Sequence, residues 1–340
     1  MNPAVPRIGT LPSGQRDAIT DVTGVTVGHA TLDDGAVQTG VTVVRPHAGD
    51  PYLHRVPAGF AVLNGFGKSV GLLQIGELGV LETPIALTNT FSVPAVAAAQ
   101  IRHCVAANPE CGRSLPTVNP LVFECNDGFL NDIQRMAVGE DHYLQAWTAA
   151  GQHVAQGSIG AGRGMSCFSL KGGIGSASRR AGAHAVGTLV LANFGLLPNM
   201  LIAGQPVGRR LAAQRADGEK GSIIMLIATD APLDARQLRR LALRAGAGLA
   251  RTGSVFGHGS GDIALAFSTA YTLPQRRDQP MPAVAMLHDG LLDDLFQAAA
   301  DSTEQAILHA LWHAAPVTGR DGHARPTLTA LLRDHNLAPS

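Results

Sequence analysis

The chain has 340 residues and carries 26 basic and 26 acidic side chains, so its formal net charge is zero. This balance argues against binding to nucleic acid or to an anionic membrane through bulk electrostatics. Apolar residues make up 45% of the chain, which excludes a disordered protein, and no apolar run of about 18 residues is present to span a bilayer. Because the N-terminus lacks a basic start followed by an apolar run, we expect no signal peptide and a cytoplasmic location.

A β-hairpin is predicted near the N-terminus. The segments 24–29 and 40–45 alternate small and β-branched residues, as half-buried strands do. Between them, Asp34 and Gly35 form a dipeptide that is typical of tight hairpin turns. We therefore expect the two segments to pair with each other.

Further strands and a first helix follow the hairpin. The apolar segments 58–67 and 79–90 indicate strands. At Ser92 the pattern changes, because a capping residue is followed by an early Pro94 and by alanine-rich spacing of helical period. We expect a helix to begin at this point, so that strands and helices mix along the chain.

Cysteine and histidine spacing indicates neither a disulfide framework nor a metal centre. The four cysteines lack CxxC spacing, and we expect buried thiols at Cys104, Cys111, Cys125 and Cys167. His309 and His313 lie four residues apart, but Ala310 stands where an HExxH motif requires glutamate. We expect no metal and no organic cofactor.

The segments 157–165 and 171–180 form the densest glycine stretch of the chain. Glycines of this kind let backbone N–H groups approach an anion. A dinucleotide site would also require an acidic residue about 20 positions later, yet none occurs between His142 and Ala216, and no Walker motif is present. Close packing and tight turns remain the alternative explanation for these glycines.

The same stretch is locally cationic in a neutral protein. A cluster of this kind suits a site where developing negative charge is stabilised, although exposed basic loops are an equally simple explanation. Its basic residues are Arg163, Lys171, Arg179, Arg180, Arg209, Arg210 and Arg215.

The second half of the chain predicts strands alternating with helices. Segments 185–195 and 222–230 have the continuous apolar pattern of buried strands. Between them, residues 208–221 are polar, charged and rich in small residues, so we expect an exposed loop directly before the second strand.

Two helices are predicted around one further strand. Residues 262–270 indicate a strand, and residues 288–314 indicate a long amphipathic helix. A helix after the strand at 222–230 is predicted by four residues that share one face, Leu238, Leu241, Ala245 and Leu249.

Seven segments in this order resemble the family of self-processing aminopeptidases that includes the L-aminopeptidase/D-amidase/esterase and the β-peptidyl aminopeptidases. The resemblance extends from about Asp21 to Ala270, over most of the chain. The segments are DVTGVTVGHATL, ECNDGFLND, GAGRGM, KGGIGSASR, ANFG, GSIIMLIATDAPL and GSGDIALAFSTA.

The resemblance implies a single catalytic domain, 1–340, that cuts itself at the bond between Gly221 and Ser222. The products would be an α chain, 1–221, and a β chain, 222–340, that remain together. The implied fold is a mixed α/β, four-layer αββα sandwich that resembles the N-terminal nucleophile hydrolases with a different connectivity. We expect processed pairs to assemble into a homo-oligomer.

The chemistry of self-cleavage fits this dipeptide. The Ser222 hydroxyl would attack the preceding carbonyl in an N-to-O acyl shift, and Gly221, without a Cβ atom, permits the strained backbone that the shift requires. Hydrolysis of the ester would free Ser222 as an N-terminus that carries both a nucleophile and an amine with a pKa near neutrality. Without the surrounding motifs, Ser222 would be an ordinary first residue of a strand.

By the same resemblance, four further residues are assigned to catalysis. Asn193 matches an asparagine that stabilises the oxyanion, and Lys171 matches a lysine that supports the nucleophile, here by keeping the Ser222 amine neutral. Ser260 and Asp262 match a pair that hydrogen-bonds near the nucleophile, at a turn that we expect to expose its side chains. A structural turn asparagine and a solvated loop lysine are the alternatives.

Substrate binding is assigned to Glu124 and Phe129. A buried carboxylate at Glu124 would pair with the ammonium group of an incoming peptide, although a strand-end carboxylate can also cap a helix. Relatives often place a tyrosine hydroxyl where this chain has Phe129. Either another tyrosine replaces it or the oxyanion hole relies on Asn193 and backbone donors. The chain has three tyrosines, namely Tyr52, Tyr143 and Tyr271.

The expected function is hydrolysis of short peptides, amides or esters, with release of an N-terminal L-, D- or β-amino acid through an acyl-Ser222 intermediate. One alternative is hydrolysis of ω-amino acid oligomers of the nylon type. Another is a non-catalytic, unprocessed binding protein of the same fold. The expected partners are a small peptide or amide substrate, with neither nucleic acid nor membrane.

Overall fold

Two β-sheets form the centre of the protein in the computed structural model, which describes residues 4–211 and 221–337. The first sheet has the order β1 (Thr26–Asp34), β2 (Val37–Arg45), β5 (Ile85–Asn89) and β6 (Leu121–Cys125). The second has the order β13 (Leu273–Pro274), β3 (His54–Gly65), β12 (Gly261–Ser268), β11 (Ser222–Thr229), β10 (His184–Asn193) and β9 (Gly173–Ala181), with β4 (Val80–Leu81) paired to β3. Two short strands, β7 (Ser166–Cys167) and β8 (Leu170–Lys171), pair separately.

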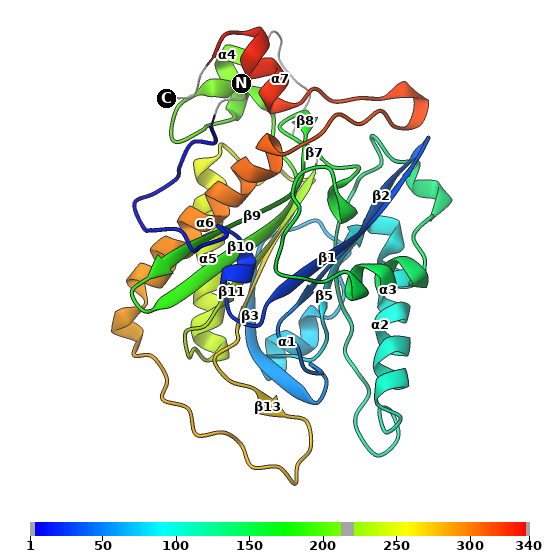
Figure 1. Ribbon diagram of the computed structural model, residues 1–340, viewed down its shortest axis with the longest axis vertical. Helices are drawn as coiled ribbons and strands as arrows, with labels where there is room; N and C mark the ends of the chain where they lie inside the picture. Colours follow the sequence, from blue (N-terminus) through cyan, green and yellow to red (C-terminus); the bar gives the residue numbers. More distant parts are fainter. Residues whose placement is uncertain (1–3, 212–220, 338–340) are drawn as a thin grey trace.

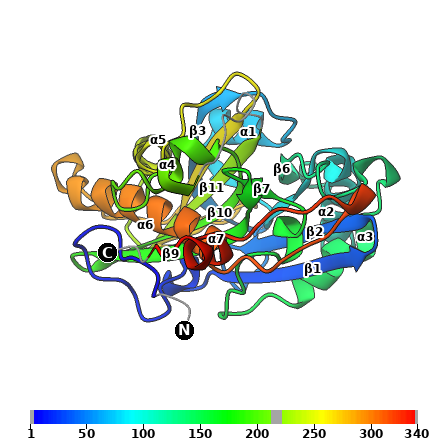
Figure 2. The same cartoon turned by 90° about the horizontal axis from the view of Figure 1, so that it is seen from above.

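Helices cover the outer faces of both sheets. In Figure 1, α5 and α6 lie over the second sheet and α2 and α3 beside the first, and Figure 2 shows the strands between these two helical layers. Within the described residues, none of the helices has the length and apolar character needed to cross a bilayer. The α-helices are α1 (Leu72–Leu78), α2 (Val93–Ala107), α3 (Glu140–Thr148), α4 (Val207–Leu211), α5 (Ala235–Arg251), α6 (Asp293–Trp312) and α7 (Leu328–Asp334). Single 3₁₀ turns cover Ile19–Asp21, Thr90–Ser92, Ile133–Arg135, Gly160–Gly162, Leu197–Asn199, Asp289–Leu291 and Arg320–Gly322.

Side-chain alternation along the strands builds the four layers. In β11, Ile224 and Leu226 belong to the core between the sheets, whereas Ile223 and Met225 belong to the core beneath α5 and α6. Successive side chains of a strand point to opposite faces, so a continuous apolar run indicates burial on both. The predicted αββα sandwich is confirmed.

Most predicted elements are confirmed, including the hairpin of β1 and β2 and the buried strands β10 and β11. In the glycine-rich stretch, residues 173–181 form strand β9, where a Cβ atom on Gly175 would lie 1.9 Å from the Ala306 carbonyl oxygen of α6, so close packing explains this glycine. The exposed loop predicted over 208–221 is wrong at its start, because residues 207–211 form α4 with Leu211 buried. Residues 212–220 of that predicted loop lie outside the described residues.

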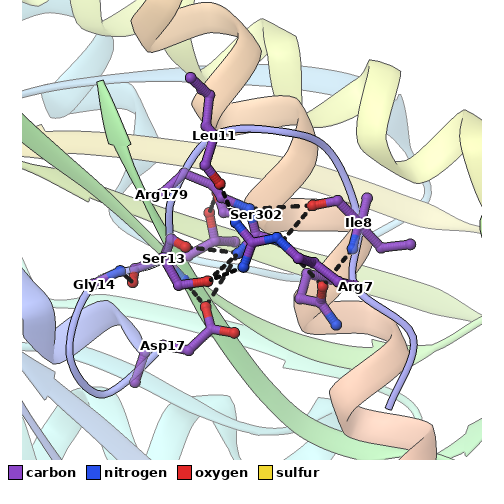
Figure 3. A network of polar contacts seen from close by, with 12 residues as sticks. Arg7, Ile8, Leu11, Ser13, Gly14, Asp17, Arg179 and Ser302 are labelled. Atoms are coloured by element: carbon purple, nitrogen blue, oxygen red, sulfur yellow. Dashed lines mark hydrogen bonds and ion pairs between the residues drawn. The ribbon is translucent and has the colours of Figure 1, made fainter. Parts of the chain in front are cut away.

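Arg179 attaches the N-terminal segment to β9 and α6, as Figure 3 shows. Its guanidinium is fully buried and donates to the Ile8 carbonyl oxygen at 2.7 Å and to the Gln305 side-chain oxygen at 3.0 Å. A third contact joins it to the Asp17 carboxylate at 3.1 Å. A buried charge requires partners of this kind, so this arginine of the cationic stretch has a structural role.

Candidate active site

Strand ends of the second sheet meet around Ser222. Ser222 begins β11 and is paired with Asn193, the last residue of β10. On the other side, β11 runs parallel to β12, with Ile223 opposite Asp262. Strand β3, the antiparallel partner of β12, ends at the same edge. The serine therefore lies at the start of a central strand, held by pairing on both sides.

A cavity of about 600 Å³ opens at this edge of the sheet. It brings together most of the residues that the sequence assigned to catalysis and binding. Ser222 has an exposed fraction of 6% and lines the cavity. The predicted residues on its wall are Glu124, Phe129, Asn193, Gly221 and Ser222.

Hydrogen bonds fix both Ser222 and Asn193. The Ser222 Oγ accepts from the backbone N–H of Gly261 at 3.0 Å. The Asn193 side chain accepts from the Ser166 N–H at 2.8 Å and donates to the Asn126 carbonyl oxygen at 2.9 Å. Because an amide nitrogen carries two hydrogens, a second N–H of Asn193 can serve a substrate oxygen beside Ser222.

The Ser260 and Asp262 side chains lie beneath the cavity rather than on its wall. Both are fully buried, so the expectation that this turn exposes them is wrong. The Ser260 hydroxyl donates to the Asp262 carboxylate at 2.5 Å, as predicted. Between them stands Gly261, whose N–H reaches Ser222. The pair is thus linked to Ser222 through the backbone of the residue between them.

Lys171 is fully buried, which removes the solvated-loop alternative. Its Nζ donates to the carbonyl oxygens of Gly162, Met165 and Gly172 at 2.8–3.0 Å. Burial lowers the pKa of Lys171 to about 7, while three acceptors match the three N–H groups of an ammonium ion. Its contacts thus support the loop before Ser166 rather than the Ser222 amine.

Glu124 presents a carboxylate to the cavity from the end of β6. Its exposed fraction is 3%, and its two oxygens accept from the Lys68 backbone N–H at 2.8 Å and from the Thr90 hydroxyl. Each carboxylate oxygen has two lone pairs, so accepting capacity remains for a ligand. A buried carboxylate with spare acceptors suits an ammonium group.

Phe129 lines the cavity, and none of the three tyrosines replaces the hydroxyl that it lacks. The Tyr52 hydroxyl donates to the Pro116 carbonyl oxygen, and that of Tyr271 donates to the Leu233 carbonyl oxygen. Tyr143 is buried in the core between the first sheet and its helices. Of the two alternatives that the sequence left open, the one based on Asn193 and backbone donors remains.

Sequence reasoning missed several residues of the cavity wall. Asn126 lay inside a motif already singled out, whereas Arg325 lies in a segment without any recognised pattern. Lys68 lies shortly after the end of β3, and its position after a predicted strand is a signal that could have identified it. The residues missed on the wall include Phe66, Lys68, Phe91, Asn126, Ser166 and Arg325.

Described residues of the cationic stretch have separate structural contacts. Arg163 pairs with Asp33 at 2.6 Å, and Arg179 holds the N-terminal segment. Lys171 contacts the loop at residues 162–166, next to the cavity. Arg215 lies outside the described residues.

Metal-ligating side chains are dispersed in the part of the chain that the structure describes, where no group of three comes together. His309 is buried, and its Nδ1 contacts the Ser176 carbonyl oxygen at 2.7 Å. All four cysteines are buried, as predicted.

Comparison with known proteins places this geometry among hydrolases. The model of peptidase family S58 matches residues 17–325. The beta-peptidyl aminopeptidase BapA of Sphingosinicella microcystinivorans is 39% identical over 341 residues, which cover 91% of this chain and 85% of the relative.

Two solved structures share the fold. A beta-aminopeptidase from Burkholderia sp. superimposes with a TM-score of 0.90 at 42% identity, over 98% of both chains. The L-aminopeptidase D-Ala-esterase/amidase from Ochrobactrum anthropi, described as a prototype for serine aminopeptidases and a variant of the Ntn hydrolase fold, gives a TM-score of 0.87 at 34% identity, over 98% of both chains.

Proposed function

The chain belongs to peptidase family S58, and we propose that Ser222 is the nucleophile with which this serine aminopeptidase acts. The observation that carries the assignment is the pairing of Ser222 with Asn193 at a cavity whose wall also holds Glu124. A nucleophile, an oxyanion donor and an ammonium acceptor are thus within reach of one small substrate.

Ser222 first cuts the chain that carries it. Its Oγ attacks the Gly221 carbonyl carbon, the C–N bond to Ser222 breaks as the C–O bond forms, and water then hydrolyses the ester. The products are a carboxylate on Gly221 and a free amine on Ser222. The positive φ of Gly221, +151°, supports this step, because such a backbone is open to glycine and strained for other residues.

The two fragments, 1–221 and 222–340, remain one catalytic domain after the cut. Strand β11 of the second fragment pairs with β10 of the first, and β12 of the second pairs with β3 of the first. The central strands of one sheet thus come from both fragments, and separating them would expose the core on both faces of that sheet.

In turnover, the free Ser222 amine takes the Oγ proton as the oxygen attacks the scissile carbonyl. An α-amino group has a pKa of about 8, close enough to neutrality for this role. The Asn193 amide and backbone N–H groups stabilise the oxyanion, and the proton passes to the leaving amine. Water then releases the acyl group from Ser222. Lys171, Ser260 and Asp262 act as positioning residues.

Glu124 selects substrates with a free N-terminal ammonium, and Phe129 contacts the bound substrate. We place β-amino acids among the released residues, because relatives at 39% and 42% identity are a beta-peptidyl aminopeptidase and a beta-aminopeptidase. A β-amino acid has an extra backbone carbon, which moves its ammonium group farther from the scissile carbonyl. The separation of Glu124 from Ser222 therefore sets the preference between α- and β-amino acids.

Assembly of processed pairs into a homo-oligomer is part of the proposal. On α1, Leu73 and Leu78 have exposed fractions of 93% and 56%, and Val62 on the adjacent strand β3 has 51%. Large exposed apolar groups near one another are typical of protein interfaces. A comparison of the sedimentation of the processed protein with that of a Leu73→Glu variant tests whether this face forms the interface of the oligomer.

One preparation tests the catalytic proposal. Intact-mass measurement of purified protein should give fragments of 221 and 119 residues, the second beginning Ser-Ile-Ile, and the Ser222→Ala variant should remain a single chain. A panel of aminoacyl p-nitroanilides with α-L, α-D and β residues then ranks the acyl groups, and blocked amines should abolish hydrolysis. An active enzyme that stays uncut, or one that accepts blocked amines, contradicts the proposal.

A further inference from the structure

Arg325 is a half-buried cation on the wall of the active-site cavity. Its guanidinium carbon lies 3.7 Å from the centre of the Phe129 ring. Within the described residues it takes part in no ion pair, and its buried Nε lacks a hydrogen-bond partner. Other arginines of the chain, such as Arg251 beside Asp301, are paired with carboxylates. A partly desolvated cation without an anion is unfavourable, so a ligand anion would find a strong partner here.

The segment that carries Arg325 is fixed to the segment around Phe129. The Arg320 Nε donates to the Gly128 carbonyl oxygen at 2.7 Å. The backbone N–H of Arg320 donates to the Leu130 carbonyl oxygen at 2.8 Å. The His323 ring stacks on Phe129 with centroids 4.7 Å apart, and its Nδ1 contacts the Phe129 carbonyl oxygen at 2.9 Å. Arg325 is thus held in place before a ligand arrives, which lowers the entropy that binding must overcome.

The charges on the cavity wall match a zwitterion. Among the side chains that line it, Glu124 is the acidic one, and Lys68 and Arg325 are the basic ones. The cut adds one carboxylate, on Gly221, and one amine, on Ser222, so it leaves the balance of charges on the wall unchanged. Lys68 is exposed, with its Nζ 4.0 Å from the centre of the Phe66 ring, whereas Arg325 is half-buried and stacked. Since a planar guanidinium presents two parallel N–H groups to a carboxylate, Arg325 is the better suited of the two.

We propose that Arg325, assisted by Lys68, binds a substrate carboxylate on the leaving-group side of the scissile bond. This inference rests on the proposed function: once Glu124 holds the ammonium of the released residue, a carboxylate in the same short peptide must lie beyond the bond that Ser222 attacks. The substrate class is therefore free dipeptides, or peptides whose second residue is acidic, in preference to neutral amides.

Three substrates of one series test the proposal: β-alanyl-alanine, β-alanyl-alaninamide and the α-carboxamide of β-alanyl-aspartate. The first has a C-terminal carboxylate, the second has none, and the third has only a side-chain carboxylate. With the processed wild-type enzyme, we expect kcat/KM for at least one of the two compounds that carry a carboxylate to exceed that for the neutral amide by about ten- to a hundredfold. A charge-assisted hydrogen bond contributes a free energy of this size. Whichever acid is preferred identifies the source of the carboxylate.

In Arg325→Gln, the ratio of kcat/KM for the preferred acid to that for the amide should fall close to one, mainly through KM. A general effect on folding or on Ser222 changes both substrates and cancels in this ratio. Arg325→Lys, which keeps the charge without the planar fork, should retain part of the preference. Arg113→Gln, at an exposed arginine that does not line the cavity, is the matched control and should keep the wild-type ratio.

A wild-type ratio near one, or a ratio that Arg325→Gln leaves unchanged, overturns the carboxylate subsite while the aminopeptidase stands. If the processed protein hydrolyses none of the three compounds and no aminoacyl p-nitroanilide, the proposed function itself fails. The two failures are therefore distinguishable in one set of assays.

Discussion

A Cβ atom placed on Gly221 would lie 1.9 Å from the carbonyl oxygen of Asn193. The same glycine has φ of +151°, a conformation that other residues rarely adopt. Asn193 and Ser222 are paired across β10 and β11, so this contact brings the backbone before the nucleophile against the end of the neighbouring strand. The bond to be cut is held in a geometry that depends on the absence of a side chain.

Gly221→Ala should therefore slow self-cleavage strongly. The new methyl group must move the Asn193 carbonyl or change φ, and either shift displaces the Gly221 carbonyl from the Ser222 Oγ. The intact fraction, followed over days by denaturing electrophoresis, measures the effect. Gly139→Ala is the matched control, because its Cβ atom would meet only a His142 atom at 3.9 Å. Equal processing of both variants would show that the backbone at residue 221 is not required.

Ser260→Ala should lower both stability and turnover. The sequence alone predicted an exposed turn here, but the lost hydrogen bond is fully buried and involves a carboxylate, so we expect the variant to lose about 1–3 kcal/mol of stability. Since Gly261 would no longer be held firmly against Ser222, kcat should fall about a hundredfold.

The matched control for this variant is Ser268→Ala. Ser268 is the last residue of β12, the strand that begins directly after Ser260. Its hydroxyl is also fully buried and donates to the Ala231 carbonyl oxygen at 2.6 Å. Both variants should melt at lower temperature, but the Ser268 variant should keep its turnover per processed molecule. If both lose activity in proportion to stability, the role of Ser260 is structural.

Lys171→Met should destabilise the protein by several kcal/mol. The substitution leaves three buried carbonyl oxygens without their common donor, and each unsatisfied group costs about 1–3 kcal/mol. The loop before Ser166 should then loosen, with slower self-cleavage in the fraction that folds. Thermal unfolding of the uncut Ser222→Ala background measures stability, and Lys68→Met, at an exposed lysine, should change it by about 0.5 kcal/mol or less. A comparable melting temperature for the two variants would contradict this account.

Asp127→Asn should stabilise the protein above neutral pH. Burial raises the pKa of Asp127 from 3.8 to about 7. Above pH 7 the carboxyl group is ionised in both folded and unfolded states, and the full cost of burying the charge is present. As the pH falls from 7 towards 4, the folded state keeps its proton and the cost disappears.

The asparagine never ionises, so its advantage should reach about 4 kcal/mol near pH 8 and vanish near pH 4. Melting temperatures of the Ser222→Ala protein with and without the substitution, measured at pH 4.5, 6 and 8, test this dependence. A difference that stays constant with pH would mean that Asp127 is not the titrating group.

Local sequence patterns were enough to predict the main strands and several residues of the cavity. Alternation and turn residues predicted the hairpin of β1 and β2, and the apolar runs predicted β10 and β11. These signals are local, since they depend on side-chain period and on backbone preferences of a few residues. Collinear motifs then pointed to Asn193 and Ser222, which the antiparallel register of β10 and β11 brings side by side.

The surroundings of these residues depend on contacts between distant parts of the chain, which became visible in the three-dimensional structure. Gly175 has no room for a side chain because α6 packs directly on it, and Lys171 is buried beside the loop at 162–166, whose carbonyl oxygens it contacts. Arg325 reaches the cavity from about 100 residues beyond Ser222, through contacts with the segment around Phe129. Burial and ion pairing arise from elements far apart in the chain, whose packing no local period encodes.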